Sequence, residues 1–132
     1  DTDTDTDTDP GGPLAILGTW VDGVYAHSIS ETEWVVTLAS APYPSSTYHI
    51  SQYSNDSGTV IAENDSTNGT NPGSWSRFDW ADVDADTIWV CHTASDGSTE
   101  ADAESTTAAD SADPATGGCS GDAWTELTIV SR

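Results

Sequence analysis

The chain has 132 residues, 35% of them hydrophobic, and it carries 23 acidic residues against two basic ones. One domain of this length is large enough to bury a core. The formal charge of -21 excludes nucleic acid as a partner, because phosphates are bound by Lys and Arg, and it equally excludes anionic membrane surfaces. A saline habitat or bound divalent cations would relieve the repulsion among the acids. The dispersal of the acids along the sequence favours the saline habitat.

The first thirteen residues, DTDTDTDTDP followed by Gly-Gly-Pro, form an acidic N-terminal arm. This composition is typical of a solvated spacer. Strict Asp/Thr alternation also has the two-residue period of a strand, with acids on one face and threonines on the other. We predict that the arm docks on a neighbouring subunit, whose sheet edge supplies hydrogen bonds and offsets the ordering entropy. The assembly residues are Asp1, Thr2, Asp3, Thr4, Asp5, Thr6, Asp7, Thr8 and Asp9.

From Leu14 onward, short alternating or apolar runs are separated by turn-rich stretches, which is the pattern of an all-β domain. The spacing of these runs predicts that residues 14–132 form a single small antiparallel barrel or sandwich of about seven or eight strands. The expected strands are Thr19–Val24, Ala26–Ser30, Trp34–Ala39, Tyr48–Ser54, Thr59–Glu63, Trp75–Trp80, Thr87–His92 and Trp124–Val130.

Turn signals separate these strands, and the sequence Ala41-Pro42-Tyr43-Pro44 is expected to be one of the turns. A hairpin is expected across Ser57-Gly58. Alternation along its first strand places His49, Ser51 and Tyr53 on one face, and Tyr48, Ile50 and Gln52 on the other. The stretch Ser98–Ala109, rich in Ala, Glu, Asp and Thr, is expected to form a short, weakly hydrophobic helix.

Cys91 and Cys119 are the only cysteines, and an even pair without CxxC spacing suggests a disulfide. Two separate buried thiols are the alternative. A bond between them would stabilise the fold by about 3–4 kcal/mol and hold the excursion Ser95–Gly118 against the sheet. Disulfides persist in oxidising compartments, so we expect an extracellular or cell-surface protein. The sequence contains no signal peptide and no membrane-spanning run, so we expect a removed export signal and no membrane insertion.

No catalytic motif is present. His27, His49 and His92 are isolated, without the spacing of a metal or hydrolase motif, and there is no GxSxG elbow. We therefore expect no enzyme activity and no required cofactor. Ca²⁺ is the one candidate cation, because alternating carboxylates can direct oxygen ligands at it. The candidate ligands are Asp82, Asp84 and Asp86, although the EF-hand Gly and Glu are missing and a solvated acidic turn is the favoured alternative.

Three N-glycosylation sequons fall close together at Asn55, Asn64 and Asn68, in turn-like surroundings that would expose them. Turn-rich composition also creates such sequons by chance. In the run WSRFDW, Phe78 and Trp80 share one strand face and Trp75 lies opposite. Some of these aromatics must be core, and one on the other face is a candidate for stacking on a sugar or a partner. Arg77 shares the Trp75 face and is expected to pair with nearby acids.

Two resemblances follow from these residues. Gly18-Thr19-Trp20 at the start of a β-meander resembles the opening of calycin barrels such as lipocalins and avidins. Over residues 18–128, the stretches YHISQYSND, IAEND, NPGSWSRFDW and ADPATGGC resemble an uncharacterised all-β module of secreted bacterial lipoproteins, which often follows an acidic Thr-rich spacer. The second resemblance implies an extracellular β domain with a Cys91–Cys119 bridge. It implies no activity.

These features together predict an extracellular, non-catalytic structural protein that self-assembles into a filament through its N-terminal arm. A head-to-tail contact of this kind is open-ended and builds fibres. The alternative is a cell-surface binding module on a flexible acidic tether, which binds carbohydrate or another ligand through exposed aromatics. The expected partners are further copies of the chain or glycans.

Overall fold

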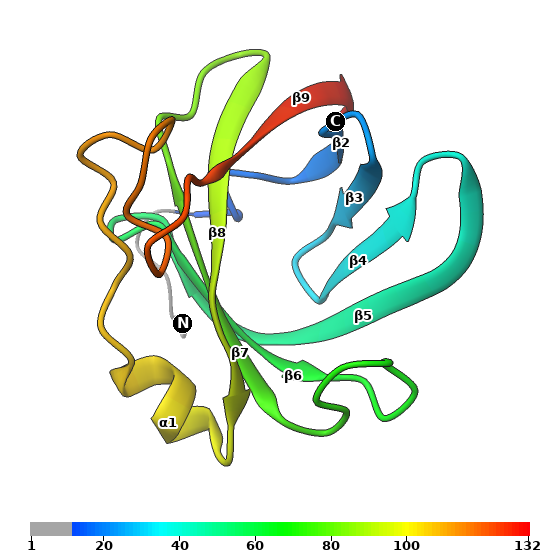
Figure 1. Cartoon of the computed structure of the whole chain (residues 1–132), viewed down its shortest axis with the longest axis vertical. Helices are drawn as coiled ribbons and strands as arrows, with labels where there is room; N and C mark the ends of the chain where they lie inside the picture. The colour runs from blue at the N-terminus through cyan, green and yellow to red at the C-terminus, as the bar shows by residue number, and fades with distance from the viewer. Residues whose placement is uncertain (1–11) are drawn as a thin grey trace.

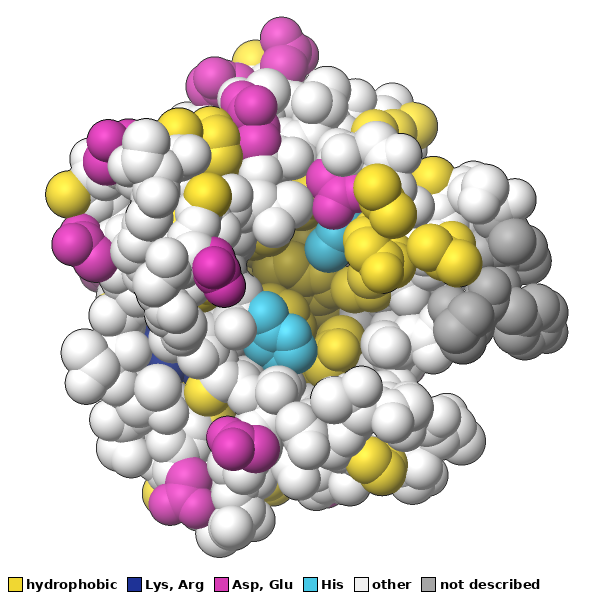
Figure 2. All heavy atoms as spheres, viewed as in Figure 1, with side chains coloured by type: hydrophobic (Ala, Val, Ile, Leu, Met, Phe, Trp, Pro, Cys, Tyr) yellow, Lys and Arg dark blue, Asp and Glu magenta, His cyan; other side chains and the backbone are white. Residues whose placement is uncertain are grey.

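The computed structural model describes residues 12–132, without the side chains of residues 41–44. Eight antiparallel strands follow one another in chain order around a closed barrel, and the last strand pairs with the first. In the same view, the surface is hollowed at the centre of this ring (Figures 1 and 2). The predicted all-β fold is confirmed, and it is a barrel rather than a sandwich. The predicted short helix is also present.

Each of the eight expected strands corresponds to a strand of the barrel. Among the described residues there is a single short helix, α1 (Glu100–Ser105), which lies within the expected helical stretch and is capped by the side chain of Thr99. The strands are β2 (Gly18–Val21), β3 (Tyr25–Ile29), β4 (Glu33–Leu38), β5 (Ala41–Ser54), β6 (Thr59–Asn64), β7 (Trp75–Ala81), β8 (Thr87–Gly97) and β9 (Thr125–Ser131).

Two local predictions about β5 were wrong, both because of irregular strand pairing. Residues 41–44 are not a turn but the start of β5: Leu38 pairs with Ala41 and Thr37 with Ser45, so the intervening prolines lie in a bulge, where sheets tolerate them. A second irregularity falls between Ile50 and Gln52. The extra residue reverses the alternation beyond it, so Tyr53 packs on the core together with Ile50 instead of facing away from it.

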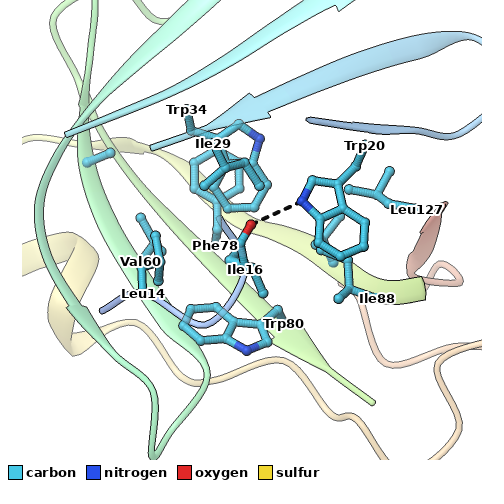
Figure 3. Packing of buried hydrophobic residues seen from close by; sticks show 12 residues of the cluster. Leu14, Ile16, Trp20, Ile29, Trp34, Val60, Phe78, Trp80, Ile88 and Leu127 are labelled. Atoms are coloured by element: carbon cyan, nitrogen blue, oxygen red, sulfur yellow. Dashed lines mark hydrogen bonds between the residues drawn. The ribbon is translucent and has the colours of Figure 1, made fainter. Parts of the chain in front are cut away.

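One end of the barrel is closed by the segment before β2. The backbone N–H groups of Leu14 and Ala15 donate to Glu31 Oε2 and Asn55 Oδ1, which holds this segment across the turns that follow β3 and β5. Leu14, Ile16 and Trp20 are buried, and the indole N–H of Trp20 donates to the Ile16 carbonyl at 3.0 Å (Figure 3). The result is an apolar plug.

Gly18 allows β2 to close the barrel against β9. Its φ is +136°, and a Cβ atom there would lie 2.7 Å from the carbonyl oxygen of Ser131. Only glycine fits this approach without displacing the backbone. Near the same place, the guanidinium of Arg132 lies 5.3 Å from the centre of the Trp20 ring.

The excursion between β8 and β9 covers the outer side of β7. The predicted disulfide is formed between Cys91 and Cys119, with a Cα–Cα distance of 5.7 Å. Beneath the excursion, the predicted pairing of Arg77 with an acid is confirmed: its guanidinium lies 3.1 Å from Asp79, and both side chains are buried. Arg77 also donates to the carbonyl oxygens of Glu104 and Thr106, which ties the end of α1 to the barrel wall.

The predicted assembly residues Asp1–Asp9 lie outside the described residues. The described chain begins at Gly12, whose carbonyl accepts a hydrogen bond from the Tyr53 hydroxyl. In the part of the chain that the structure describes, no helix has the length and apolar character needed to cross a bilayer.

Candidate functional site: the open end of the barrel

The end of the barrel opposite the plug opens to solvent through a cavity of about 240 Å³. Figure 2 shows this hollow, with a hydrophobic floor and histidine side chains at its sides. A wider depression of about 800 Å³ lies along the outside of β2 and β3, but it is open to solvent on most sides. We call the cavity of about 240 Å³ at the open end the mouth. Its lining includes Tyr25, His27, Trp34, Tyr48, Phe78 and His92.

Three parallel rings form one wall of the mouth. Phe78 stacks on Trp34 with a centroid distance of 4.2 Å, and on His92 with the same distance. Tyr48 meets both Phe78 and His92 edge-on, at 5.1 and 5.2 Å. Trp34 and Phe78 are buried, whereas His92 is exposed. The wall is therefore anchored in the core and presents its outermost ring to the cavity.

His27 has a fixed tautomer, because Trp34 can only donate. The Trp34 indole N–H donates to Nδ1 of His27 at 3.0 Å, so in the neutral ring the proton sits on Nε2. Nε2 lies 4.0 Å from a carboxylate oxygen of Asp22. Burial lowers the pKa of His27, and the Asp22 carboxylate partly opposes that shift. His27 is thus a neutral hydrogen-bond donor at the side of the mouth.

His92 takes the opposite tautomer through a relay of buried polar groups. The side-chain amide of Asn64 donates to the carbonyl oxygens of Asn71 and Ser95, at 2.9 Å each, which orients the amide. Asn64 Oδ1 then accepts from the hydroxyl of Ser76 at 2.5 Å, and that hydroxyl lies 2.8 Å from Nε2 of His92. Because the Ser76 proton is used toward Asn64, Ser76 accepts from His92 Nε2–H.

The relay leaves Nδ1 of His92 unprotonated, with its lone pair available. Within the described residues, this nitrogen has no hydrogen-bond partner. Protein surrounds the imidazole on most sides, although solvent reaches it through the mouth, and this burial lowers the pKa of His92 to about 4. At neutral pH, the mouth therefore presents an acceptor at His92 and a donor at His27.

The electrostatic setting of the mouth disfavours anions. Among the described residues that line the mouth, Asp22 carries a carboxylate and none is an arginine. Arg77 is paired with Asp79 beneath the excursion, and Arg132 lies over Trp20 near the closed end. A negatively charged ligand would meet Asp22 and the overall charge of -21 without a compensating cation.

The three predicted calcium ligands form an exposed turn between β7 and β8. Asp84 accepts from the backbone N–H groups of Asp86 and Thr87 and from the Thr87 hydroxyl, and these hydrogen bonds lower the pKa of Asp84. Across residues 12–132, no group of three His, Cys, Asp or Glu side chains gathers in a way that could hold a metal ion. Calcium binding at Asp82, Asp84 and Asp86 stays a prediction.

The expected exposure of the sequons is wrong for two of the three asparagines. Asn64 and Asn68 are 2% and 6% exposed. Asn64 belongs to the His92 relay, and Asn68 exchanges hydrogen bonds with the backbone N–H and carbonyl of Thr47. Asn55 is half-buried and bonds to Ala15 and Pro13. Asn side chains replace missing backbone partners in turns, which draws them inward here.

The aromatics of β7 divide as their alternation predicts. Phe78 and Trp80 belong to the core, with Phe78 also part of the aromatic wall of the mouth, and Trp75 is half-buried on the opposite side. His27 and His92 were not singled out from the sequence. A signal for both existed in the sequence. His27 lies two positions before the buried Ile29, and His92 lies two positions after the buried Val90, so each histidine occupies an inward position of its strand.

No protein-family model matches this sequence, and comparisons with curated proteins and with solved structures found no match either. The geometry of the chain itself is therefore the basis for a functional proposal.

Proposed function

We propose that this chain is an exported, non-catalytic binding module that holds a small ring-shaped ligand in the mouth of its barrel. The carrying observation is a solvent-open cavity with a stacked aromatic wall and two histidines in fixed, opposite tautomers. Small-molecule sites commonly combine an apolar cavity with a few placed polar groups. The disulfide is compatible with an oxidising, extracellular compartment.

The size of the cavity limits the ligand. Pockets for drug-sized molecules measure about 300–1,000 Å³, and the mouth, at about 240 Å³, is smaller. The ligand that fits has one or two rings. A single monosaccharide lies within this range, so the mouth is also a candidate site for the carbohydrate binding expected from the sequence.

The test is a thermal-shift screen of the full chain against heterocycles, phenols and monosaccharides, followed by calorimetry. A ligand at a hundred times its Kd should stabilise the fold by about 2.7 kcal/mol. The variant Val36→Trp fills the mouth and should abolish binding. Val130→Trp makes the same change at a side chain that is 60% exposed, and should bind normally. Hits that survive Val36→Trp, or no hit at all, would contradict the proposal.

Filament assembly is a second candidate, favoured by one feature of β5. This strand pairs with β4 from Ala41, but its pairing with β6 begins only at Tyr48. In the described chain, residues 41–46 therefore have a strand ladder on one side. An unpaired edge of this kind accepts an added strand, which a neighbour's N-terminal arm would supply.

Electron microscopy of the full chain and of a variant lacking residues 1–11 separates the two candidates. The deletion leaves Gly12 and Pro13, which contact Tyr53 and Asn55. Assembly through the arm predicts fibres from the full chain and monomers from the deletion variant. A full chain that stays monomeric at high concentration and high salt would exclude this mechanism.

A further inference from the structure

We infer that the ligand of the mouth is a flat, uncharged or cationic ring system that donates an N–H or O–H hydrogen bond to Nδ1 of His92. The inference rests on the proposed function and specifies the chemistry by which the site selects its ligand. Three features carry it: the unused lone pair of His92, the flat aromatic wall and the absence of a cation in the described lining.

The lone pair sets the requirement for a donor. Asn64 is 2% exposed and Ser76 is fully buried, so their hydrogen bonds cannot easily be exchanged with water. Two backbone carbonyls orient the amide of Asn64, its Oδ1 accepts a hydrogen bond from the Ser76 hydroxyl, and the Ser76 oxygen in turn accepts one from Nε2–H of His92. A ligand that covers Nδ1 without a donor leaves an acceptor unsatisfied, which weakens binding.

The wall sets the requirement for a flat ring. Trp34, Phe78 and His92 are nearly parallel, with interplanar angles of 18° and 13° between successive rings. Tyr48 fixes this stack from the side. The lone pair of Nδ1 lies in the plane of the His92 ring, so the donor of the ligand approaches the edge of that ring, and a flat ring system lets the rest of the ligand lie against the other aromatic side chains of the lining.

The charge of the ligand follows from Asp22. This carboxylate lies 4.0 Å from the His27 donor nitrogen, so it faces the polar side of the mouth. It repels a carboxylate or phosphate on the ligand and tolerates a neutral or positive group. His27 adds a donor through Nε2–H, which suits a ligand with an acceptor on its far edge.

The experiment compares indole with benzofuran, which has nearly the same shape but an oxygen in place of the N–H. Calorimetry with the full chain should give a Kd for indole about tenfold lower than for benzofuran. In parallel, ¹⁵N NMR of the imidazoles should show the Nδ1 signal of His92 shifting on addition of indole. Indole-3-carboxylate keeps the donor and adds a negative charge, so it should bind more weakly than indole.

His92→Phe keeps a ring against Phe78 and removes the acceptor, so indole and benzofuran should bind this variant equally. His49→Phe makes the same change at a histidine outside the mouth and should keep the tenfold preference. Equal binding of both probes to the wild type, blocked by Val36→Trp, would overturn the donor requirement and leave the proposed function intact. Binding of monosaccharides but not indole would likewise overturn the inference about the ligand and leave the proposed function intact. If nothing binds in the mouth, both fail.

Discussion

The two ends of this barrel use similar residues for opposite purposes. At the closed end, Trp20 is fully buried and its indole N–H donates to the backbone of Ile16, so this indole has no free polar group. At the mouth, Trp34 is equally buried, but its N–H goes to His27 and sets the tautomer of a side chain that lines a cavity. The hydrogen-bond partner of the buried indole, rather than its burial, separates the closed end from the proposed binding end.

The largest expected difference between the two ends is the loss of stability on replacing an aromatic side chain by alanine, which should be greatest for Trp20→Ala. Removing this side chain opens a cavity in the plug and should cost about 3–5 kcal/mol of unfolding free energy. Tyr25→Ala removes an aromatic at the mouth that is 43% exposed, and should cost less than about 1 kcal/mol. Urea unfolding of both variants measures the comparison. Similar losses in the two variants would mean that the mouth is part of the structural core.

Asn64→Ala tests whether the relay behind His92 links the core to the mouth. Loss of the amide leaves buried partners unsatisfied and should cost about 1–3 kcal/mol. It should also allow Ser76 to donate to His92, so that ¹⁵N NMR detects a mixture of His92 tautomers. Asn68→Ala removes a comparably buried amide that bonds only to Thr47, and it should lower stability without altering His92. An unchanged His92 in Asn64→Ala would contradict the relay.

A smaller effect is expected in the pH dependence of stability. The folded-state pKa values of His27 and His92 lie below the unfolded value of 6.5, and that of His92 is about 4. Between these values the unfolded chain binds a proton at His92 that the folded protein does not. The free energy of unfolding is therefore unaffected by His92 above pH 6.5, and it falls as the pH decreases from 6.5 toward 4.

Thermal unfolding between pH 7 and 4 measures this slope. His92→Phe should flatten the curve, and His49→Phe, outside the mouth, serves as the matched control. Because solvent reaches His92, only the direction of the change is predicted. A wild-type curve no steeper than that of His92→Phe would show that His92 is not held neutral by the fold.

The sequence predicted the strands and the disulfide because both depend on local patterns. Alternation between turn signals located all eight strands, and an isolated pair of cysteines was enough to suggest Cys91–Cys119. The inward turn of Tyr53 could not be predicted, because it depends on one extra residue in β5 whose position follows from pairing with β6. Local pattern gives the elements but not the irregularities of their register.

The mouth could not be predicted from the sequence either, because it depends on how the strands pair. His92 appears isolated in the sequence, and its partners Ser76 and Asn64 come from two other strands. Asn64 looked like an exposed turn residue because its type is common in turns, yet here it replaces backbone partners inside the barrel. A site built from single residues on several strands emerges only once the strands are placed side by side.

The most direct test of the difference between the two ends is an NMR titration of the full chain with indole, following the side-chain signals of all three histidines and six tryptophans. The account predicts shifts at His27, His92 and the indole of Trp34, and none at Trp20. Shifts centred on the closed end or on the outer surface, or no saturable shift at the mouth, would contradict it.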